Sequence, residues 1–225
     1  MQEFRRFPLT YGIIALCTAA YLLSALVSGS FIDIDLRALV AIGALYGPLT
    51  VLHGEWWRLL SAMFLHGGMT HLLMNMVSLY IVGRGVELYF SKTAYLAIYL
   101  FSGIIGGLVS SAIHPLSVGV GASGAIFGIF GALAGFFIVH RKVLAEHSRM
   151  FMKDFAVILG LNFLLGMGVA SIDMSAHIAG LVVGMVGGIL LSKKPAHLAL
   201  YSLLMTVAAA VMVYMLPSYY ASIAL

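Results

Sequence analysis

The chain is dominated by long runs of apolar residues that leave little polar surface. Of its 225 residues, 62% are hydrophobic and only 9% are charged. Soluble domains carry about 25% charged residues, so a chain of this composition lacks the polar exterior that water requires. Runs of about 20 apolar residues are long enough to cross the hydrocarbon core of a bilayer as helices. We therefore expect an all-α polytopic membrane protein.

Seven apolar stretches are long enough to cross as helices. They lie at residues 9–28, 70–90, 94–113, 120–140, 154–172, 175–192 and 198–217. The segment 29–69 is too polar and irregular to cross, so we expect a long first loop with its paired tryptophans at the membrane surface. No A-x-A-like cleavage site follows the first stretch before Phe31, which indicates a retained span rather than a signal peptide.

The distribution of basic residues predicts the orientation in the membrane. The net charge is +4, but the twelve lysines and arginines lie in short clusters between apolar runs, which argues against a nucleic-acid partner. All of them except Arg37 and Arg58 fall on one side of the predicted membrane. Because basic loops stay in the cytoplasm, the N-terminus is predicted to be cytoplasmic and the C-terminus outside. The expected location is the bacterial cell membrane.

Four polar side chains early in three of the spans are candidates for chemistry. They are His71 and Asn75 in the second span, Ser123 in the fourth and His177 in the sixth. Polar groups inside spans are costly, so each is a functional candidate. In the predicted orientation these three spans all run inward from the outer face. The four side chains therefore share one shallow depth and can form one site.

The chemistry of these residues suits acyl transfer. A serine hydroxyl becomes a nucleophile when a neutral histidine takes its proton, as Ser123 and His177 could do. His71 and Asn75 are four residues apart on one helix face, and both can donate hydrogen bonds to a developing oxyanion. Asp173 is expected in the loop before the sixth span, so no carboxylate orients His177. A Ser–His dyad is favoured over a triad.

Glycines line the spans of the serine and the histidine at the spacing of one helix face. They are Gly124, Gly128, Gly131 and Gly135 in the fourth span and Gly180, Gly184 and Gly188 in the sixth. Small residues at this spacing let two membrane helices approach until their backbones meet. His177 shares the glycine face of its span, so it is predicted to point at the fourth span. The run Gly121 to Gly124 is expected to leave backbone N–H groups free near Ser123.

At these residues the sequence resembles the rhomboid family of intramembrane serine proteases. The motifs are Gly121-Ala122-Ser123-Gly124, Ala176-His177-Ile178-Ala179-Gly180 followed by Gly184, His71-Leu72-Leu73-Met74-Asn75, Trp57-Arg58 and the pair Gly83 and Glu87. The resemblance covers about residues 10–192. Each motif is weak alone, but their joint order and spacing are specific.

The resemblance implies a six-helix protease core over residues 1–192, with 193–225 as an additional seventh transmembrane helix. It implies a serine endopeptidase that cleaves transmembrane proteins near the outer membrane edge, without a cofactor or a metal ion. Ser123 would be the nucleophile and His177 the base. His71, Asn75 and the Ser123 backbone N–H would form the oxyanion site.

Other positions are expected to support this site. A common bacterial pattern has an aromatic hydroxyl four residues after the serine, and Phe127 here keeps the stacking on the base but lacks the hydroxyl. The glycines Gly121, Gly124, Gly180 and Gly184 would support the two catalytic helices. Trp57 and Arg58 would order the first loop, and Glu87 would be a structural tie, to Arg84 or to backbone amides at the inner membrane edge. Loop histidines such as His66 and His114 are expected to be solvated.

The sequence leaves two alternatives to a protease function, and it also predicts a gate. A transporter or metal-handling channel could use His71, His177 and methionines, but the chain has no H-E-x-x-H motif, no mid-span acidic residue and no evident inverted repeat. An inactive rhomboid-like binding protein would normally lack the serine or the histidine, and both are present. The segment from Phe163 to Met174, with a short loop at 166–169, is predicted to act as the gate.

Overall fold

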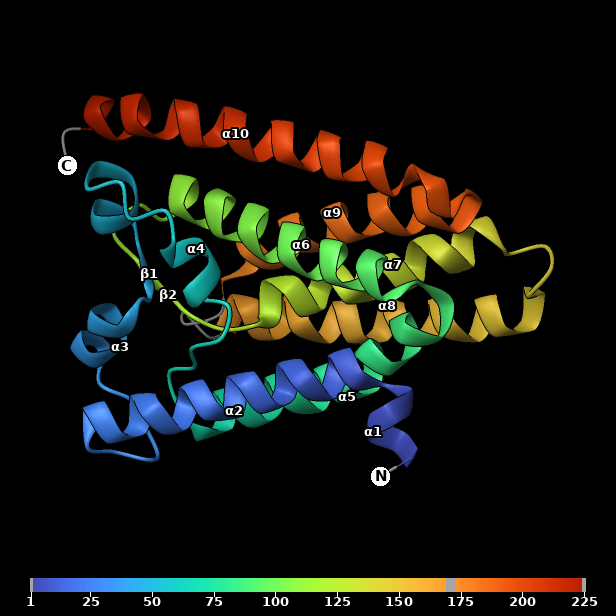
Figure 1. The fold of residues 1–225 in the computed structure, drawn as a ribbon, viewed down its shortest axis with the longest axis horizontal. Helices are drawn as coiled ribbons and strands as arrows, with labels where there is room; N and C mark the ends of the chain where they lie inside the picture. Colours follow the sequence, from blue (N-terminus) through green and yellow to red (C-terminus); the bar gives the residue numbers. More distant parts are fainter. Residues whose placement is uncertain (1, 169–172, 224–225) are drawn as a thin grey trace.

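The computed structural model describes residues 2–168 and 173–223, and its long helices lie side by side along one common direction (Figure 1). The long helices are α2 (Pro8–Ser28), α5 (Met69–Tyr89), α6 (Lys92–Ile113), α7 (Ser123–Val139), α8 (Ala145–Gly168), α9 (Met174–Lys193) and α10 (Leu198–Ser222). A short helix, α1 (Gln2–Arg6), precedes them. The two ends of the chain lie at opposite ends of the bundle (Figure 1).

The all-α fold predicted from the sequence is confirmed, because each of the seven apolar stretches overlaps one long helix. Among the described residues, four helices are both long and apolar enough to span a membrane: α2, α6, α9 and the helical segment Pro195–Ser222. The apolar helix α7 has only 17 residues. The other two predicted spans, α5 and α8, carry more polar residues, which lowers their mean hydropathy.

Helix α8 differs most from its prediction. It begins at Ala145 rather than at 154, so part of the predicted basic loop is helical. It also continues to Gly168, which contradicts the predicted loop over 166–168. The remaining part of the proposed gate, residues 169–172, lies outside the described residues. Apolar content marks where a helix can enter the bilayer, but a helix can continue beyond that point through residues with good helix propensity.

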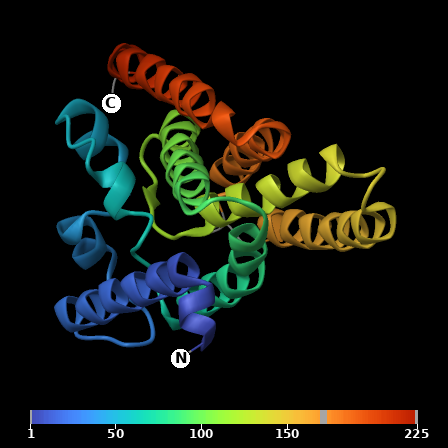
Figure 2. The same ribbon diagram turned by 45° about the vertical axis from the view of Figure 1, so that its right-hand side comes forward.

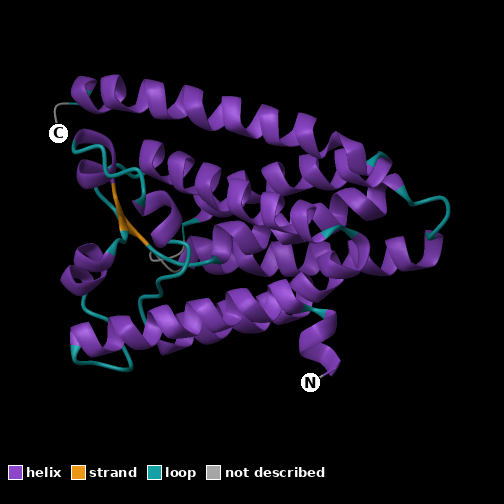
Figure 3. Cartoon of the chain, in the orientation of Figure 1, coloured by secondary structure: helices purple, strands orange, loops and turns teal. Residues whose placement is uncertain are grey.

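The first loop is far more ordered than its composition indicates. It contains α3 (Leu36–Ile42), the strand β1 (Leu45–Tyr46), the π-helical turn η1 (Pro48–Leu52) and α4 (Arg58–Ser61). Strand β1 pairs antiparallel with β2 (Val118–Gly119), which directly precedes the Ser123 segment (Figure 3). This pairing ties the first loop to the start of α7.

A buried arginine holds this loop together. Arg58 is only 5% exposed, and its guanidinium donates to the carbonyls of Val40 (2.7 Å) and Ala44 (3.0 Å) and to the Glu55 carboxylate (2.6 Å). The same group lies 4.8 Å from the centre of the Trp57 ring. Because three segments of the loop meet at one cation, their arrangement is fixed without a large apolar core.

The end of the bundle near the N-terminus has its own polar tie. The Glu87 carboxylate near the end of α5 accepts hydrogen bonds from the backbone N–H groups of Leu9 (3.0 Å) and Thr10 (2.9 Å). These groups are in the first turn of α2, where helix N–H groups have no partner within the helix. Arg84 instead lies 3.8 Å from the Glu3 carboxylate. Of the two partners predicted for Glu87, the structure shows the backbone amides.

Helix α7 is the centre of the bundle, with α5, α6, α8 and α9 around it (Figure 2). Most of its side chains are buried, from Ala125 near its start to Phe137 near its end. Its first residue is Ser123, so the fold places the candidate nucleophile at the end of the most enclosed helix. Helix α10 lies on the outside, where the Tyr220 hydroxyl donates to the Ser111 carbonyl of α6 (2.8 Å).

Candidate active site

Ser123 and His177 meet at the ends of α7 and α9. The Ser123 Oγ and the His177 Nε2 are 2.7 Å apart, within hydrogen-bond distance. Ser123 is the first residue of α7, and His177 is in the first turn of α9. His177 is 7% exposed, so this hydrogen bond is largely shielded from competing water. The structure therefore brings together the two residues that the sequence predicted as a dyad.

The glycine faces explain why the two helix ends can approach so closely. A Cβ atom added at Gly180 would collide with the carbonyl of Gly124, and one at Gly184 would collide with the carbonyl of Gly128. One turn further along, a Cβ at Gly188 would meet the carbonyl of Ala132. Contact partners advance together along both chains, so α7 and α9 run parallel with their backbones in direct contact. The first turns of the two helices are consequently adjacent.

The ring of Phe127 fixes the plane of the candidate base. The Phe127 and His177 rings are stacked, with centroids 4.3 Å apart and planes inclined by 9°. Phe127 is four residues after Ser123, which places it on the same face of α7. Within the described part of the chain, the buried His177 Nδ1 has no hydrogen-bond partner. The imidazole is thus oriented by stacking and by Ser123.

His71 lies beside the segment that leads into Ser123. Gly121 has a φ of +123°, a conformation that side chains rarely adopt, and a Cβ there would be 2.8 Å from the His71 Nε2. The same hypothetical atom would be 3.8 Å from the Ser123 Oγ. The Gly121 N–H donates to the Ala62 carbonyl (2.9 Å), which holds this turn against the first loop. His71 is therefore close enough to Ser123 to serve the same site.

Asn75 is placed differently from His71. Its side-chain Nδ2 donates to the carbonyl of His71 in its own helix (2.9 Å), and its buried Oδ1 has no partner in the described residues. The amide lies one turn deeper than His71 along α5. An oxyanion role for Asn75 stays a prediction, and in this conformation one of its two N–H donors is already used.

Asp173 was assigned to a loop by the sequence, but its carboxylate organises the start of α9. One oxygen accepts from the backbone N–H groups of Ser175 (3.0 Å) and Ala176 (3.1 Å) and from the Ser175 hydroxyl (2.5 Å). The Ser110 hydroxyl also binds it, and the His114 Nε2 is 4.0 Å away. An aspartate two residues before a serine at the start of an apolar run is a typical N-cap pattern, and this signal could have found it.

The charge state of Asp173 follows from these contacts. Burial alone would raise its pKa, but the hydrogen bonds from Ser110, Ser175 and Ala176 and the nearby His114 favour the ionised form more strongly. The net effect lowers the Asp173 pKa below its ordinary value. A fixed negative charge therefore lies one helical turn before His177, whose backbone N–H donates to the Asp173 carbonyl (3.3 Å).

The prediction that His66 is solvated is wrong. The residue is 0% exposed, and its ring centroid is 5.1 Å from that of His71 in an edge-to-face arrangement. Its Nδ1 is 3.2 Å from the Phe64 carbonyl, and burial is the main cause that lowers the His66 pKa to about 3. His66 is thus neutral at physiological pH. His66 belongs to the first loop, and its burial follows from the folded arrangement of that loop rather than from a local sequence pattern.

A small cavity of about 70 Å³ opens beside Ser123. It is lined by residues of α6, α7, the first loop and the start of α9, including Met63, Gly107 and Asp173. The space is large enough for a water molecule or a small side chain. Its walls are mainly apolar, so the serine faces a confined site rather than open solvent.

Comparison with known proteins gives one consistent result. A family model described as the Rhomboid domain matches residues 53–194. The chain is 39% identical to "Rhomboid protease GluP" of Bacillus subtilis (strain 168) over 175 residues, which are 78% of this chain and 33% of that protein. It is 41% identical to "Putative rhomboid protease YdcA" of the same organism over 147 residues, which are 64% of this chain and 69% of that protein. It is 33% identical to "RHOMBOID-like protein 6, mitochondrial" of Arabidopsis thaliana over 165 residues, 73% of this chain and 53% of that protein.

Proposed function

The chain belongs to the rhomboid family, and we propose that it is an intramembrane serine endopeptidase that cleaves transmembrane proteins with a dyad of Ser123 and His177. The observation that carries this proposal is the 2.7 Å contact between the Ser123 Oγ and the His177 Nε2 in a shielded site. The matched segment spans about a third of the GluP chain. Residues 1–192 would form the protease core and 193–225 the additional helix.

The geometry supports a two-step acyl transfer. His177 Nε2 accepts the Ser123 proton as the Oγ attacks the scissile carbonyl, and the imidazolium then gives that proton to the leaving amine. Water hydrolyses the acyl-enzyme in the second step, with His177 again acting as the base. Stacking on Phe127 keeps the ring plane fixed through both proton transfers. The Asp173 charge, one turn away, favours the imidazolium without a direct hydrogen bond.

Two kinds of donor are available for the oxyanion. The Ser123 backbone N–H is at the first position of α7, where N–H groups have no partner within the helix. The His71 Nε2 lies across the Gly121 turn and would supply the second donor. Loss of one such donor typically costs about 2.7–4 kcal/mol of transition-state stabilisation. Asn75 would contribute as a further donor or by holding His71 through its carbonyl.

The expected cleavage depth follows from the arrangement of the bundle. Ser123 begins α7, at the end of the bundle opposite to α1 (Figure 1). Ten of the twelve basic residues lie in α1, near the α5–α6, α7–α8 and α9–α10 turns, or in the first part of α8. If basic loops face the cytoplasm, the site is near the outer membrane surface and substrates are cut there. The relatives come from a bacterium, from Arabidopsis thaliana and from Toxoplasma gondii, so family membership alone does not assign the chain to a bacterial membrane.

The test is cleavage of a reporter transmembrane protein by the purified protein in liposomes. Ser123→Ala and His177→Ala should each abolish cleavage, and a fluorophosphonate probe should label the parent protein at Ser123 but not the His177→Ala variant. His140, which is outside the site, offers a matched control as His140→Ala. Cleavage by Ser123→Ala at the parental rate would refute the proposal and would favour a binding role.

A further variant, His71→Ala, addresses the transporter alternative when it is compared with Ser123→Ala. Among the described residues, no group of three or more His, Cys, Asp or Glu side chains is close enough to hold a metal ion. Metal uptake that is lost in His71→Ala but kept in Ser123→Ala would support transport. We expect no such difference, and we expect both variants to lose or weaken proteolysis.

A further inference from the structure

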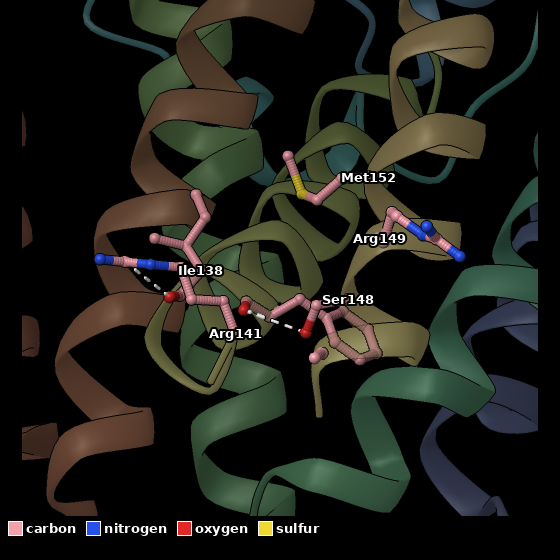
Figure 4. Close-up of a pocket in the computed structure, with 7 residues that line it drawn as sticks. Ile138, Arg141, Ser148, Arg149 and Met152 are labelled. Atoms are coloured by element: carbon pink, nitrogen blue, oxygen red, sulfur yellow. Dashed lines mark hydrogen bonds between the residues drawn. The ribbon is translucent and has the colours of Figure 1, made fainter. Parts of the chain in front are cut away.

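A second hollow lies at the other end of the bundle from Ser123, between the end of α7 and the start of α8 (Figure 4). Its volume is about 240 Å³. Phe137 and Ile138 of α7 and Met152 of α8 form much of its apolar lining. None of these residues takes part in the site described above, so this hollow requires its own explanation.

Apart from two arginines, the lining of the hollow contains little that would bind a polar molecule. The buried Ser148 hydroxyl is already used, because it donates to the Phe137 carbonyl (3.4 Å). Ala145, at the first position of α8, adds only a methyl group. An apolar lining of this kind suits a hydrocarbon chain rather than a soluble polar ligand.

Two arginines flank this apolar surface. Arg141 and Arg149 both line the hollow and extend to opposite sides of it (Figure 4). The Arg141 guanidinium donates one hydrogen bond, to the Ile138 carbonyl (3.2 Å), which leaves its other N–H groups available. In the described part of the chain, no carboxylate lies within ion-pair distance of either guanidinium. Arginine presents a planar set of donors that matches phosphate oxygens.

The position in the bundle identifies the class of ligand. The hollow is where the chain turns from α7 to α8, at the end that also carries the α9–α10 turn with Lys193 and Lys194 (Figure 1). In a membrane protein such turns are at the level of the lipid headgroups. Basic pockets between helices at this level attract anionic headgroups, while the apolar surface next to them contacts acyl chains.

We propose that this hollow binds one anionic phospholipid. An acyl chain packs against Phe137, Ile138 and Met152, and Arg141 and Arg149, one on either side of the hollow, attract the anionic headgroup. The lipid would fill the space between α7 and α8 at this end of the bundle. The proposal does not depend on proteolytic activity, because no residue of the Ser123 site is involved.

The test is lipid retention by the full-length protein. The protein is extracted from vesicles made of equal parts of phosphatidylcholine and phosphatidylglycerol, and bound lipids are identified by native mass spectrometry. We expect preferential retention of phosphatidylglycerol. The double variant Arg141→Gln/Arg149→Gln should retain it on the order of tenfold less, because two positive charges beside the anionic headgroup are lost. Met152→Trp, which fills the hollow without changing charge, should also reduce retention.

A matched control separates a specific site from general surface charge. Lys193→Gln/Lys194→Gln removes the same charge from the same end of the bundle but away from the hollow, and it should retain lipid like the parent protein. Equal loss in this control would overturn the proposal, as would equal retention of phosphatidylcholine. Displacement of the lipid by inorganic phosphate would identify a free-anion site instead and would also refute it. Thermal melting of each variant checks that folding is intact, and a double variant that fails to fold leaves Met152→Trp as the deciding comparison.

Discussion

Helices α9 and α8 both pack against α7 (Figure 2). Helix α9 makes its contact through backbone atoms, whereas α8 makes its contact through side chains. Helix α9 meets α7 backbone to backbone, because Gly180 and Gly184 face the carbonyls of Gly124 and Gly128. Helix α8 meets α7 through aromatic side chains, with Phe151 stacked on Phe137 at a centroid distance of 4.6 Å. The α7–α9 interface positions the candidate base against the nucleophile. Helix α8 carries neither of these two residues.

The two interfaces differ in how far their atoms can move when a residue is replaced. A backbone contact cannot adjust when a side chain grows, because the atoms on both sides belong to rigid helices. A contact between side chains can repack, at a cost that is usually small when volume is conserved. We therefore expect function to depend steeply on the α7–α9 interface and weakly on the α7–α8 interface.

The largest effect is expected from Gly184→Val. The new side chain would overlap the Gly128 carbonyl and separate the helices. A misplacement of about 1 Å at a catalytic centre can cost on the order of 100-fold in rate, so cleavage and fluorophosphonate labelling should be lost. Overpacking typically costs about 1–3 kcal/mol, which a lowered melting temperature would show.

The control for this change is Gly12→Val in α2, where an added Cβ meets nothing within 4 Å. It introduces the same side chain into a long helix and should leave activity at the parental level. Parental activity in Gly184→Val would show that α7 and α9 tolerate separation and would remove the distinction between the two interfaces.

The α7–α9 interface was also the part most readable from the sequence. Glycine spacing and the order of the motifs are local patterns, and they placed Ser123, His177 and Phe127 on facing helix surfaces. A pattern of this kind encodes a helix face directly, because side chains three and four residues apart lie together. The same reasoning gave the seven long helices, since apolar length alone indicates a helix in a membrane.

What the sequence missed depends on contacts between distant segments. The order of the first loop rests on Arg58 reaching the carbonyls of Val40 and Ala44, a meeting that no local pattern predicts. The pairing of β1 with β2 has the same origin. The role of Asp173 was not predicted although its capping pattern is present in the sequence, because Asp173 binds backbone N–H groups of α9 rather than the His177 side chain.

A smaller effect is expected from Phe127→Leu, which keeps the α7–α9 backbone contact but removes the stacked ring. Aromatic stacking is worth about 0.5–1.5 kcal/mol beyond area burial, so kcat should fall by up to roughly tenfold. KM should change little, because the ring contacts the base rather than the substrate. Steady-state kinetics with the reporter would measure both. Phe127→Tyr, which retains the stack, is the matched control, and an equal fall in kcat there would argue against stacking as the cause.

A still smaller effect is expected at the entrance of α9. Asp173→Ala removes the N-cap, which typically costs about 1 kcal/mol of stability, and should slow cleavage a few-fold through a less well-placed His177. Asp173→Asn keeps an oxygen that can cap the helix but removes the charge. If Asp173 acts only as a cap, Asn restores both stability and rate, whereas a contribution of its charge leaves the rate low.

The pH dependence of stability provides an independent measurement of that charge. The pKa of Asp173 is lower in the folded protein than its ordinary value of 3.8, so its ionised form stabilises the fold above that pH. This contribution declines as pH falls below 3.8 and through the lower folded value. The stability difference between the parent and Asp173→Asn should therefore shrink with acidification in that window, as measured by chemical denaturation. A difference that stays constant with pH would exclude a charge contribution.

The smallest effect is expected on the other side of α7, from Phe151→Leu in α8. The change removes the stack on Phe137 but leaves an apolar side chain that can repack, so the loss of stability should be below about 1.5 kcal/mol. Fluorophosphonate labelling of Ser123 should proceed at the parental rate, because α9 and not α8 sets the distance between Ser123 and His177. Labelling lost to the same extent as in Gly184→Val would mean that the position of α7 depends on both neighbours equally. Parental labelling together with a lowered melting temperature would instead separate the two interfaces, since stability would respond to α8 while the geometry of the dyad would not.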